Sequence, residues 1–347
     1  MSPAAGRAGA GLGGARRKRA RPAPVVCSMD AGGLRPRTSN VRPQPGAERV
    51  LIVSPVYNEG KHLDRTARAI AAQERPPDRW VIVDDGSRDD TLLIARRWMR
   101  KLPYLTVMSA SEAPDGADRL ALAREARAFN LGLQEADWGS FTHIGKLDGD
   151  VELPPHWFAT LLARFRAEPA LGLAGGRLEE PSPDGWQRIA IPDSHIHGAV
   201  KLYSRECLQA IGGIEERLAW DTIDETYARM RGYETRSLPD LVARHHRHWG
   251  SADGRLRGRA RHGQCAWVLH QSLPWALLRS VKLARVPPAG LSGAAFAYGY
   301  LSAAARRTPR VEDPQFRRFV RRELRGRLLA PVRGTAGRQR NGSVPLA

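Results

Sequence analysis

Apolar runs separated by polar turns recur through the middle of the chain. Residues 50–53 (Val-Leu-Ile-Val) and 80–83 (Trp-Val-Ile-Val) are short and uninterrupted, a pattern typical of strands buried on both faces. Between them, residues 63–71 place apolar side chains at helical spacing, and a Pro-Pro pair then ends the helix. This succession of strand, helix and strand predicts the βαβ unit of a parallel sheet.

The same alternation continues along the chain. Further strands are expected at 105–108, 142–147, 171–174, 199–203 and 235–238, and further helices at 92–99, 121–135, 157–165 and 224–230. The predicted fold class is therefore α/β, with a mostly parallel sheet flanked by helices. Ligands of such sheets bind at the carboxyl ends of the strands, and the polar clusters of this sequence follow those ends.

Composition divides the chain into four segments. Residues 1–48 are rich in Gly, Ala, Pro and Arg and have few large apolar side chains, so we expect them to be disordered. Residues 49–254 form the predicted α/β domain. Residues 255–330 are expected to be a helical, basic and amphipathic appendage with a possible role at a membrane, and 331–347 a disordered tail.

The appendage leaves its relation to a membrane open. Residues 267–286 mix Trp, Leu and Val with Arg and Lys, as basic amphipathic helices do, and 286–305 carry no charge. The uncharged stretch is long enough for a span, but its Pro, Gly and Ala content makes it weakly hydrophobic. A span, an interfacial or re-entrant contact and an ordinary helical hairpin all remain open.

The net charge of +19 is concentrated at the two ends. Residues 1–48 contain 9 Lys/Arg against 2 Asp/Glu, residues 255–347 contain 19 against 3, and the middle contains 27 against 31. A nucleic-acid reader more often carries its basic face on the folded domain, so we expect no nucleic-acid partner. Basic flanks suit peripheral contact with an anionic membrane.

Cysteine usage and the N-terminus favour a cytoplasmic protein. The three cysteines, Cys27, Cys207 and Cys265, are widely spaced and form no zinc or redox motif, so we predict reduced thiols. The basic residues near the N-terminus precede prolines and polar residues instead of an apolar run, and thus predict no signal peptide. The expected location is the cytoplasm, with a peripheral place at the inner face of the cell membrane as the alternative.

Two polar clusters follow the first two predicted strands. Pro55 turns the chain out of the sheet, and Tyr57 and Glu59 can stack on and hydrogen-bond a nucleobase, although an ordinary polar loop has the same composition. Asp84 and Asp85 follow the second strand, where an acidic side chain can bind a base or ribose. Together the clusters favour nucleotide contact.

A third cluster follows the strand at 142–147. Asp148, Asp150 and Glu152 offer oxygen ligands to a hard divalent cation, which can also bridge a diphosphate. Lys146, just before them, is assigned to donor binding with Asp148. His246 lies in a run of Arg and His residues that fits metal or diphosphate binding as well as it fits a solvated basic loop.

A fourth cluster precedes and begins the helix predicted at 224–230. Asp221 can deprotonate an acceptor hydroxyl. Asp224 and Glu225 can do the same, or can stabilise the positive end of the helix.

Taken in this order, the clusters resemble glycosyltransferase family 2, the inverting enzymes with the GT-A fold, over residues 49–250. In that family the Pro-x-Tyr-Asn-Glu loop and the Asp-Asp-Gly-Ser turn hold the nucleotide. The resemblance therefore assigns donor binding to Pro55, Tyr57, Glu59, Asp84 and Asp85.

The resemblance also implies a divalent cation and a second set of donor contacts. The Asp-x-Asp motif matches Asp148 and Asp150, which would bind the donor diphosphate through Mg²⁺ or Mn²⁺. Glu152 lies where related enzymes often have a Gln ligand. Arg127 and Asn130 match the basic and Asn contacts of the family to the donor.

The catalytic base and the acceptor are assigned in the same way. The Glu-Asp pair of the family is here Trp220-Asp221, so Asp221 is the first candidate for the base and Asp224 the second. The resemblance implies an inverting transfer from a nucleoside-diphosphate sugar to a saccharide or lipid-linked acceptor, in cell-envelope polysaccharide or glycolipid synthesis. Residues 259–264 match the Gln-x-x-Arg-Trp signature of processive synthases only loosely, because the Trp is absent.

Three other functions were considered. A sugar-1-phosphate nucleotidyltransferase would need a Gly-rich, basic loop after the first strand, where this chain has Val53-Ser54-Pro55-Val56-Tyr57. A nucleic-acid-binding protein would leave the ordered acidic clusters without a role. A catalytically inactive scaffold is disfavoured because the three acids Asp148, Asp150 and Asp221 are all present.

Overall fold

The computed structural model describes residues 48–110, 118–247 and 254–333. The ends predicted to be disordered, 1–48 and 331–347, lie almost wholly outside these ranges.

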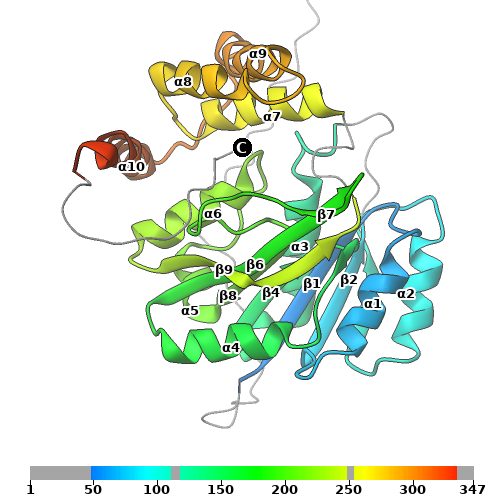
Figure 1. The fold of residues 1–347 in the computed structure, drawn as a ribbon. Coiled ribbons are helices and arrows are strands. Elements are labelled where there is room, and N and C mark those ends of the chain that lie inside the picture. Colours follow the sequence, from blue (N-terminus) through cyan, green and yellow to red (C-terminus); the bar gives the residue numbers. More distant parts are fainter. Residues whose placement is uncertain (1–47, 111–117, 248–253, 334–347) are drawn as a thin grey trace, which may run out of the picture. The chain divides into compact units, whose positions relative to one another are not determined.

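The described residues contain nine strands that form one sheet. They are β1 (Val50–Val56), β2 (Arg79–Asp84), β3 (Leu105–Ser109), β4 (His143–Leu147), β5 (Val151–Glu152), β6 (Leu171–Ser182), β7 (Gly185–Arg188), β8 (Val200–Ser204) and β9 (Glu234–His245). The order is β3-β2-β1-β4-β8-β6-β9-β5, with β7 paired to β6 (Figure 1). The first four are parallel as predicted, whereas β8 is antiparallel to both β4 and β6.

Six helices of the α/β region alternate with these strands. They are α1 (Leu63–Ala71), α2 (Thr91–Met99), α3 (Arg124–Ala136), α4 (Trp157–Ala167), α5 (Arg205–Ala210) and α6 (Trp220–Met230). Helix α6 begins four residues before the predicted 224–230, directly after Ala219, whose φ of 68° interrupts the preceding backbone. Asp224 and Glu225 therefore lie in the second turn of α6, and Asp221 is the acid of its first turn.

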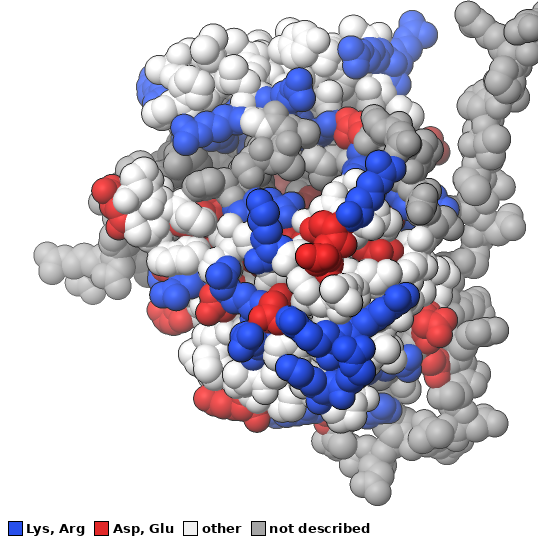
Figure 2. All heavy atoms as spheres, turned by 90° about the vertical axis from the view of Figure 1, so that its right-hand side faces the viewer, with Lys and Arg blue, Asp and Glu red and all other residues white. Residues whose placement is uncertain are grey.

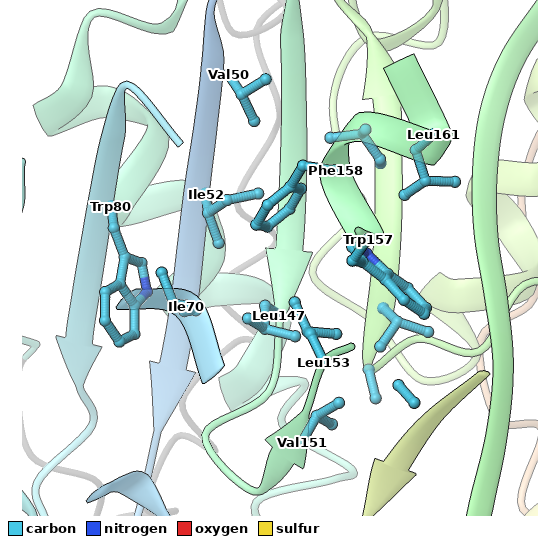
Figure 3. Packing of buried hydrophobic residues seen from close by; sticks show 14 of the residues in the cluster. Val50, Ile52, Ile70, Trp80, Leu147, Val151, Leu153, Trp157, Phe158 and Leu161 are labelled. Carbon is cyan, nitrogen blue, oxygen red and sulfur yellow. The ribbon is translucent and has the colours of Figure 1, made fainter. Parts of the chain in front are cut away.

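Alternate residues of each central strand bury against different helices. Val50 and Ile52 of β1 belong to a core cluster with residues of α1, α2 and α4, and Leu51 and Val53 belong to a second cluster with Phe129 of α3. Figure 3 shows Ile52 beside Phe158 of α4. Because the side chains of a strand alternate between its two faces, an uninterrupted apolar run packs against the helices on both faces of the sheet.

Four further helices follow the sheet. They are α7 (Arg255–Val268), α8 (Leu273–Leu283), α9 (Leu291–Ala305) and α10 (Pro314–Arg333). Helices α7 and α9 pack with their backbones in contact, since a Cβ at Gly299 would overlap the carbonyl oxygen of Ala260. Helix α10 docks on α6 through Arg229 Nε, which donates to Glu323 Oε1 at 2.8 Å. Within the described ranges, every helix is too short or too polar to cross a membrane.

Lys and Arg side chains gather on the face that carries α1 and α2 (Figure 2). Arg96, Arg97, Arg100 and Lys101 are all exposed there. Asp64 accepts hydrogen bonds from Arg97 and from Arg68, at 2.5 and 2.8 Å, so part of this charge is neutralised locally.

Candidate active site

A pocket of about 450 Å³ opens at the carboxyl ends of β1, β2 and β4. Val56 and Asp84, the last residues of β1 and β2, are register partners, and Asp148 directly follows β4. Adjoining strand ends thus bring together residues that are distant in the sequence. Of the residues predicted to form the site, the following line this pocket: Pro55, Tyr57, Glu59, Asp85, Asp148, Asp150 and Asp221.

Tyr57 and Asp85 lie together at one end of the pocket, with two arginines that the sequence analysis did not identify. The Arg119 guanidinium carbon lies 3.5 Å from the centre of the Tyr57 ring. The Asp85 carboxylate forms ion pairs with Arg119 and Arg124, and Arg124 Nε donates to it at 3.1 Å. A base that stacks on this face of Tyr57 therefore has to displace Arg119.

Asp148 and Asp150 lie on a tight turn packed against the loop after β1. A Cβ at Gly149 would lie 2.9 Å from Val56 Cγ1, and Thr66 Oγ1 donates to the Gly149 carbonyl at 2.8 Å. The absence of a side chain at this glycine lets the two carboxylates approach the end of β1 closely.

His245 and Arg247 face Asp150 from the end of β9. His245 Nε2 and Arg247 Nε each lie 3.4 Å from a carboxylate oxygen of Asp150. Burial opposes a charge on His245, but hydrogen bonds to Asp150 and Glu180 outweigh it and raise the pKa of His245 to about 10. Burial likewise opposes ionisation of Asp150, yet His245 and Arg247 hold its pKa below the usual range. Asp150 is thus an anion that the positive charges of His245 and Arg247 stabilise.

Glu59 is held in the same cluster of acids. It is 8% exposed, and it accepts a hydrogen bond of 2.7 Å from Arg247 Nη2. Burial, followed by the negative charges of Asp150 and Asp148, raises the pKa of Glu59 to about 8. This mutual repulsion is what a divalent cation would relieve.

The donor set fits a cation that shares its coordination with a diphosphate. Over the ranges that the structure describes, three or more His, Cys, Asp or Glu side chains are nowhere arranged to enclose an ion. Mg²⁺ is commonly bound by one or two carboxylates together with substrate phosphates and water. Asp148 and Asp150 match that arrangement.

Glu152 and His246, the other predicted metal ligands, pair with each other. Their Oε2 and Nε2 atoms are 2.7 Å apart, and neither residue lines the pocket. His245, the last residue of β9, faces Asp150, whereas the side chain of His246, just after the strand, turns to Glu152.

The two candidate bases differ in their surroundings. Asp221, in the first turn of α6, lines the pocket. Asp224 is 2% exposed and accepts hydrogen bonds from Lys201 Nζ, at 2.8 and 2.9 Å, and from the Tyr203 hydroxyl. Burial is the largest cause that raises the pKa of Asp224, to about 6. The structure therefore brings Asp221 to the pocket and engages Asp224 in a buried network.

The remaining predicted donor contacts do not line the pocket. Asp84 is 4% exposed and accepts from the Ser87 amide at 3.3 Å, and Asn130 donates to the Ile214 carbonyl at 2.8 Å. Arg127 is exposed on α3. Lys146 is buried, pairs with Asp148 and Glu125 and donates to the Gly198 carbonyl, so it acts on the pocket through residues that line it.

Several pocket residues carry no sequence signal that marks them. Glu125 and His197 lie in segments without a motif, and Arg119 and Arg124 are two of the many arginines of the chain. Helix α7, which is distant in the sequence from the other pocket residues, forms one wall of the pocket. Its Arg261 forms an ion pair of 2.5 Å with Asp118. The α7 residues in the lining are Gly258, Arg261, His262 and Cys265.

Comparison with known proteins shows similarity to one family over part of the chain. Residues 51–207 match the family model described as glycosyl transferase family 2. The glycosyltransferase AglE of Haloferax volcanii is 25% identical over 154 residues, which cover 44% of this chain and 46% of that protein. Validoxylamine A glucosyltransferase of Streptomyces hygroscopicus subsp. limoneus is 31% identical over 115 residues, 30% of this chain and 25% of that protein. The matches thus span less than half the length of each relative.

Similarity to a solved structure concerns the fold alone. GalNAc-T7, solved with UDP, GalNAc and Mn²⁺, is 13% identical with a TM-score of 0.53, over 83% of this chain and 58% of that chain. This similarity, the strand order and the motif match agree with the GT-A fold predicted from the sequence. Residues 51–207 of this chain are therefore similar to glycosyltransferase family 2, within a fold of the GT-A type.

Proposed function

We propose that this chain is a metal-dependent inverting glycosyltransferase, which transfers a sugar from a nucleoside-diphosphate donor to an acceptor hydroxyl. The observation that carries the proposal is the meeting of three chemistries in one pocket. Tyr57 and Asp85 suit a nucleoside, Asp148 and Asp150 suit a diphosphate with its cation, and Asp221 suits an acceptor proton.

Asp148 and Asp150 would hold the cation. When bound, a divalent cation neutralises the diphosphate and makes it a better leaving group. Lys146 orients this end of the site, because its ammonium group binds Asp148 and also donates to the Gly198 carbonyl at 2.9 Å. The role of the buried Lys146 is thus to hold the Asp148 carboxylate in place.

Asp221 would act as the general base. As the acceptor oxygen attacks the anomeric carbon, its proton passes to Asp221, and the bond from that carbon to the diphosphate oxygen breaks. The nucleoside diphosphate leaves with the bonding electron pair. A single displacement inverts the anomeric carbon, so an α-linked donor yields a β-linked product without a covalent enzyme intermediate.

The outer face of α8 and α9 supports a membrane-borne acceptor. Seven large apolar residues of α8 and α9 are at least 40% exposed: Leu273, Leu277, Leu278 and Val281 on α8, and Leu291, Tyr298 and Leu301 on α9. Lys282 and Arg285 are exposed beside them. An apolar face with adjacent cations suits the surface of an anionic membrane. We infer peripheral contact at the inner face of the cell membrane, with a saccharide or lipid-linked acceptor of the cell envelope.

Nucleotidyl transfer is the less favoured alternative. Strand β1 continues through Ser54 and Pro55 to Val56, and the loop that follows begins with Tyr57 and Asn58. This loop has one glycine, Gly60, beside Lys61, and not the run of glycines that binds a triphosphate.

A donor screen tests the proposed function. UDP-, GDP- and dTDP-sugars are added with and without MnCl₂, and thermal stabilisation and hydrolysis of each donor are measured. We expect one nucleotide class to stabilise the protein only when Mn²⁺ is present, and EDTA to remove the effect. Turnover of a nucleoside triphosphate with a sugar 1-phosphate, without binding of any nucleotide sugar, would contradict the proposal in favour of nucleotidyl transfer.

A further inference from the structure

His197 lies in the wall of the pocket and has a polar atom that the fold leaves without a partner. The residue is 4% exposed and lines the pocket. Its Nε2 atom is buried and makes no hydrogen bond with the residues that the structure describes. Buried polar atoms are usually satisfied, and an orphaned one at a binding site indicates that a ligand supplies the partner.

The backbone around His197 is anchored to α6. Glu225, which is 2% exposed, accepts a hydrogen bond of 2.8 Å from the Ile196 amide through Oε1. Its Oε2 lies 3.0 Å from His195 Nδ1. Two contacts from one buried carboxylate therefore hold the backbone that carries His197 before any ligand binds.

This segment lies between the diphosphate end of the pocket and the candidate base. The Asp148 amide donates to the Ala199 carbonyl at 3.0 Å. On the other side, a Cβ at Gly198 would lie 3.4 Å from the Cβ of Asp221. The transferred sugar is bonded to the diphosphate and contains the carbon that the acceptor attacks, so it must occupy the space between Asp148 and Asp221.

The imidazole of His197 is neutral. Burial is the largest cause that lowers its pKa, to about 3, and the positive charges of His195, His245 and Arg177 act in the same direction. A neutral imidazole has one donor and one acceptor nitrogen. A hydroxyl both donates and accepts, so it satisfies Nε2 in either tautomer, whereas a phosphate oxygen can only accept.

We propose that His197 Nε2 binds a hydroxyl group of the sugar being transferred and thereby helps to select the donor sugar. This inference rests on the proposed glycosyltransferase function and deepens it. The contact belongs to the sugar, so it contributes to binding of a nucleotide sugar and not to binding of the nucleoside diphosphate alone.

The test compares two dissociation constants in each variant. UDP, GDP and dTDP, and UDP-glucose, UDP-N-acetylglucosamine, GDP-mannose and dTDP-glucose, are titrated by calorimetry with MnCl₂ present. For the pair that the wild type binds, the ratio of the Kd of the sugar nucleotide to the Kd of its nucleoside diphosphate should rise roughly three- to tenfold in His197→Ala. His197→Gln, whose amide reaches the position of Nε2, should keep the ratio near that of the wild type, and the shorter His197→Asn should not.

His143→Ala is the matched control. His143 is also a buried histidine whose pKa is lowered, mainly by burial, to about 4, but it lies outside the pocket. In His143→Ala, the ratio of the Kd of the sugar nucleotide to the Kd of its nucleoside diphosphate should equal that of the wild type. An unchanged ratio in His197→Ala and His197→Asn, with nucleotide sugar still bound by the wild type, would overturn the inference alone. A wild type that binds none of the nucleotide sugars would overturn the proposed function and the inference together.

Discussion

Asp221 and Asp224 lie one turn apart on α6, yet their environments differ. Asp221 lines the pocket, whereas Asp224 is buried between Lys201 and Tyr203. A carboxylate that takes the proton of the acceptor needs access to the substrate, and a buried partner of a lysine contributes to stability instead.

Asp221→Asn should therefore lower kcat by ~10²–10⁴-fold and leave the Kd of the donor unchanged, because the base acts on the acceptor. Steady-state kinetics and donor titration measure the two quantities. Asp224→Asn should lower the free energy of unfolding by about 3–5 kcal/mol, since the buried Lys201 charge loses a partner. If Asp221→Asn turns over normally while folded Asp224→Asn is inactive, the motif has been aligned three residues out of register. Activity in both would point to another acid of the pocket, such as Glu125.

Asp150 provides the second test at this scale. Asp150→Ala should abolish Mn²⁺-dependent binding of the donor, because it removes one of the two pocket carboxylates proposed to hold the cation. Glu152→Ala is its control, since the Glu152 carboxylate is paired with His246 outside the pocket. Calorimetric titration of the nucleotide sugar with MnCl₂ measures both. Metal-dependent binding that survives in Asp150→Ala, or is lost in Glu152→Ala, would contradict this assignment of ligands.

Among the helices, α7 depends on α9 for its position. The two helices cross where Gly263 and Gly299 lack side chains, so their backbones meet. Residues of α7 form one wall of the pocket, whereas no residue of α9 lines the pocket. Helix α9 therefore sets the position of this wall through its contact with α7.

Gly299→Ala should destabilise this crossing, because its Cβ would overlap the backbone of Ala260. Overpacking of this kind costs about 1–3 kcal/mol. Gly326→Ala in α10 is the matched control, since a Cβ there meets nothing within 4 Å and alanine is the better helix former. Chemical denaturation compares the two variants. Equal stability of both would show that the α7–α9 contact accommodates the added methyl group.

At the scale of the whole molecule, the apolar face of α8 and α9 and the pocket wall formed by α7 belong to one helical unit. Helix α7 contacts the pocket, and α9 packs on α7 while it exposes Leu291, Tyr298 and Leu301. In the proposed membrane-bound state, this unit would connect the apolar outer face of α8 and α9, the proposed docking face, with the active site.

Charge on the docking face should weaken membrane binding. We expect the double variant Leu277→Asp and Val281→Asp to sediment less with anionic liposomes than the wild type. It replaces two exposed apolar side chains with negative charges, which the anionic surface repels. Leu93→Asp is the control, because Leu93 is 67% exposed but lies on α2, away from this face. This variant should sediment as the wild type does. Equal sedimentation of all three proteins would exclude this face as the membrane contact.

The sequence by itself determined the alternation of strands and helices, the mostly parallel sheet and the edge of the sheet at which the pocket lies. Apolar runs and helical spacing are local, and parallel strands bring the residues after them to one edge, so Tyr57, Asp85 and Asp148 could be expected to meet. The tertiary structure decided which neighbours face the pocket. His245 faces it and His246 does not, and Asp221 faces it while Asp224 is buried. These choices depend on strand pairing, on where α6 begins and on the path that returns α7 to the site, and such long-range contacts leave no local pattern in the chain.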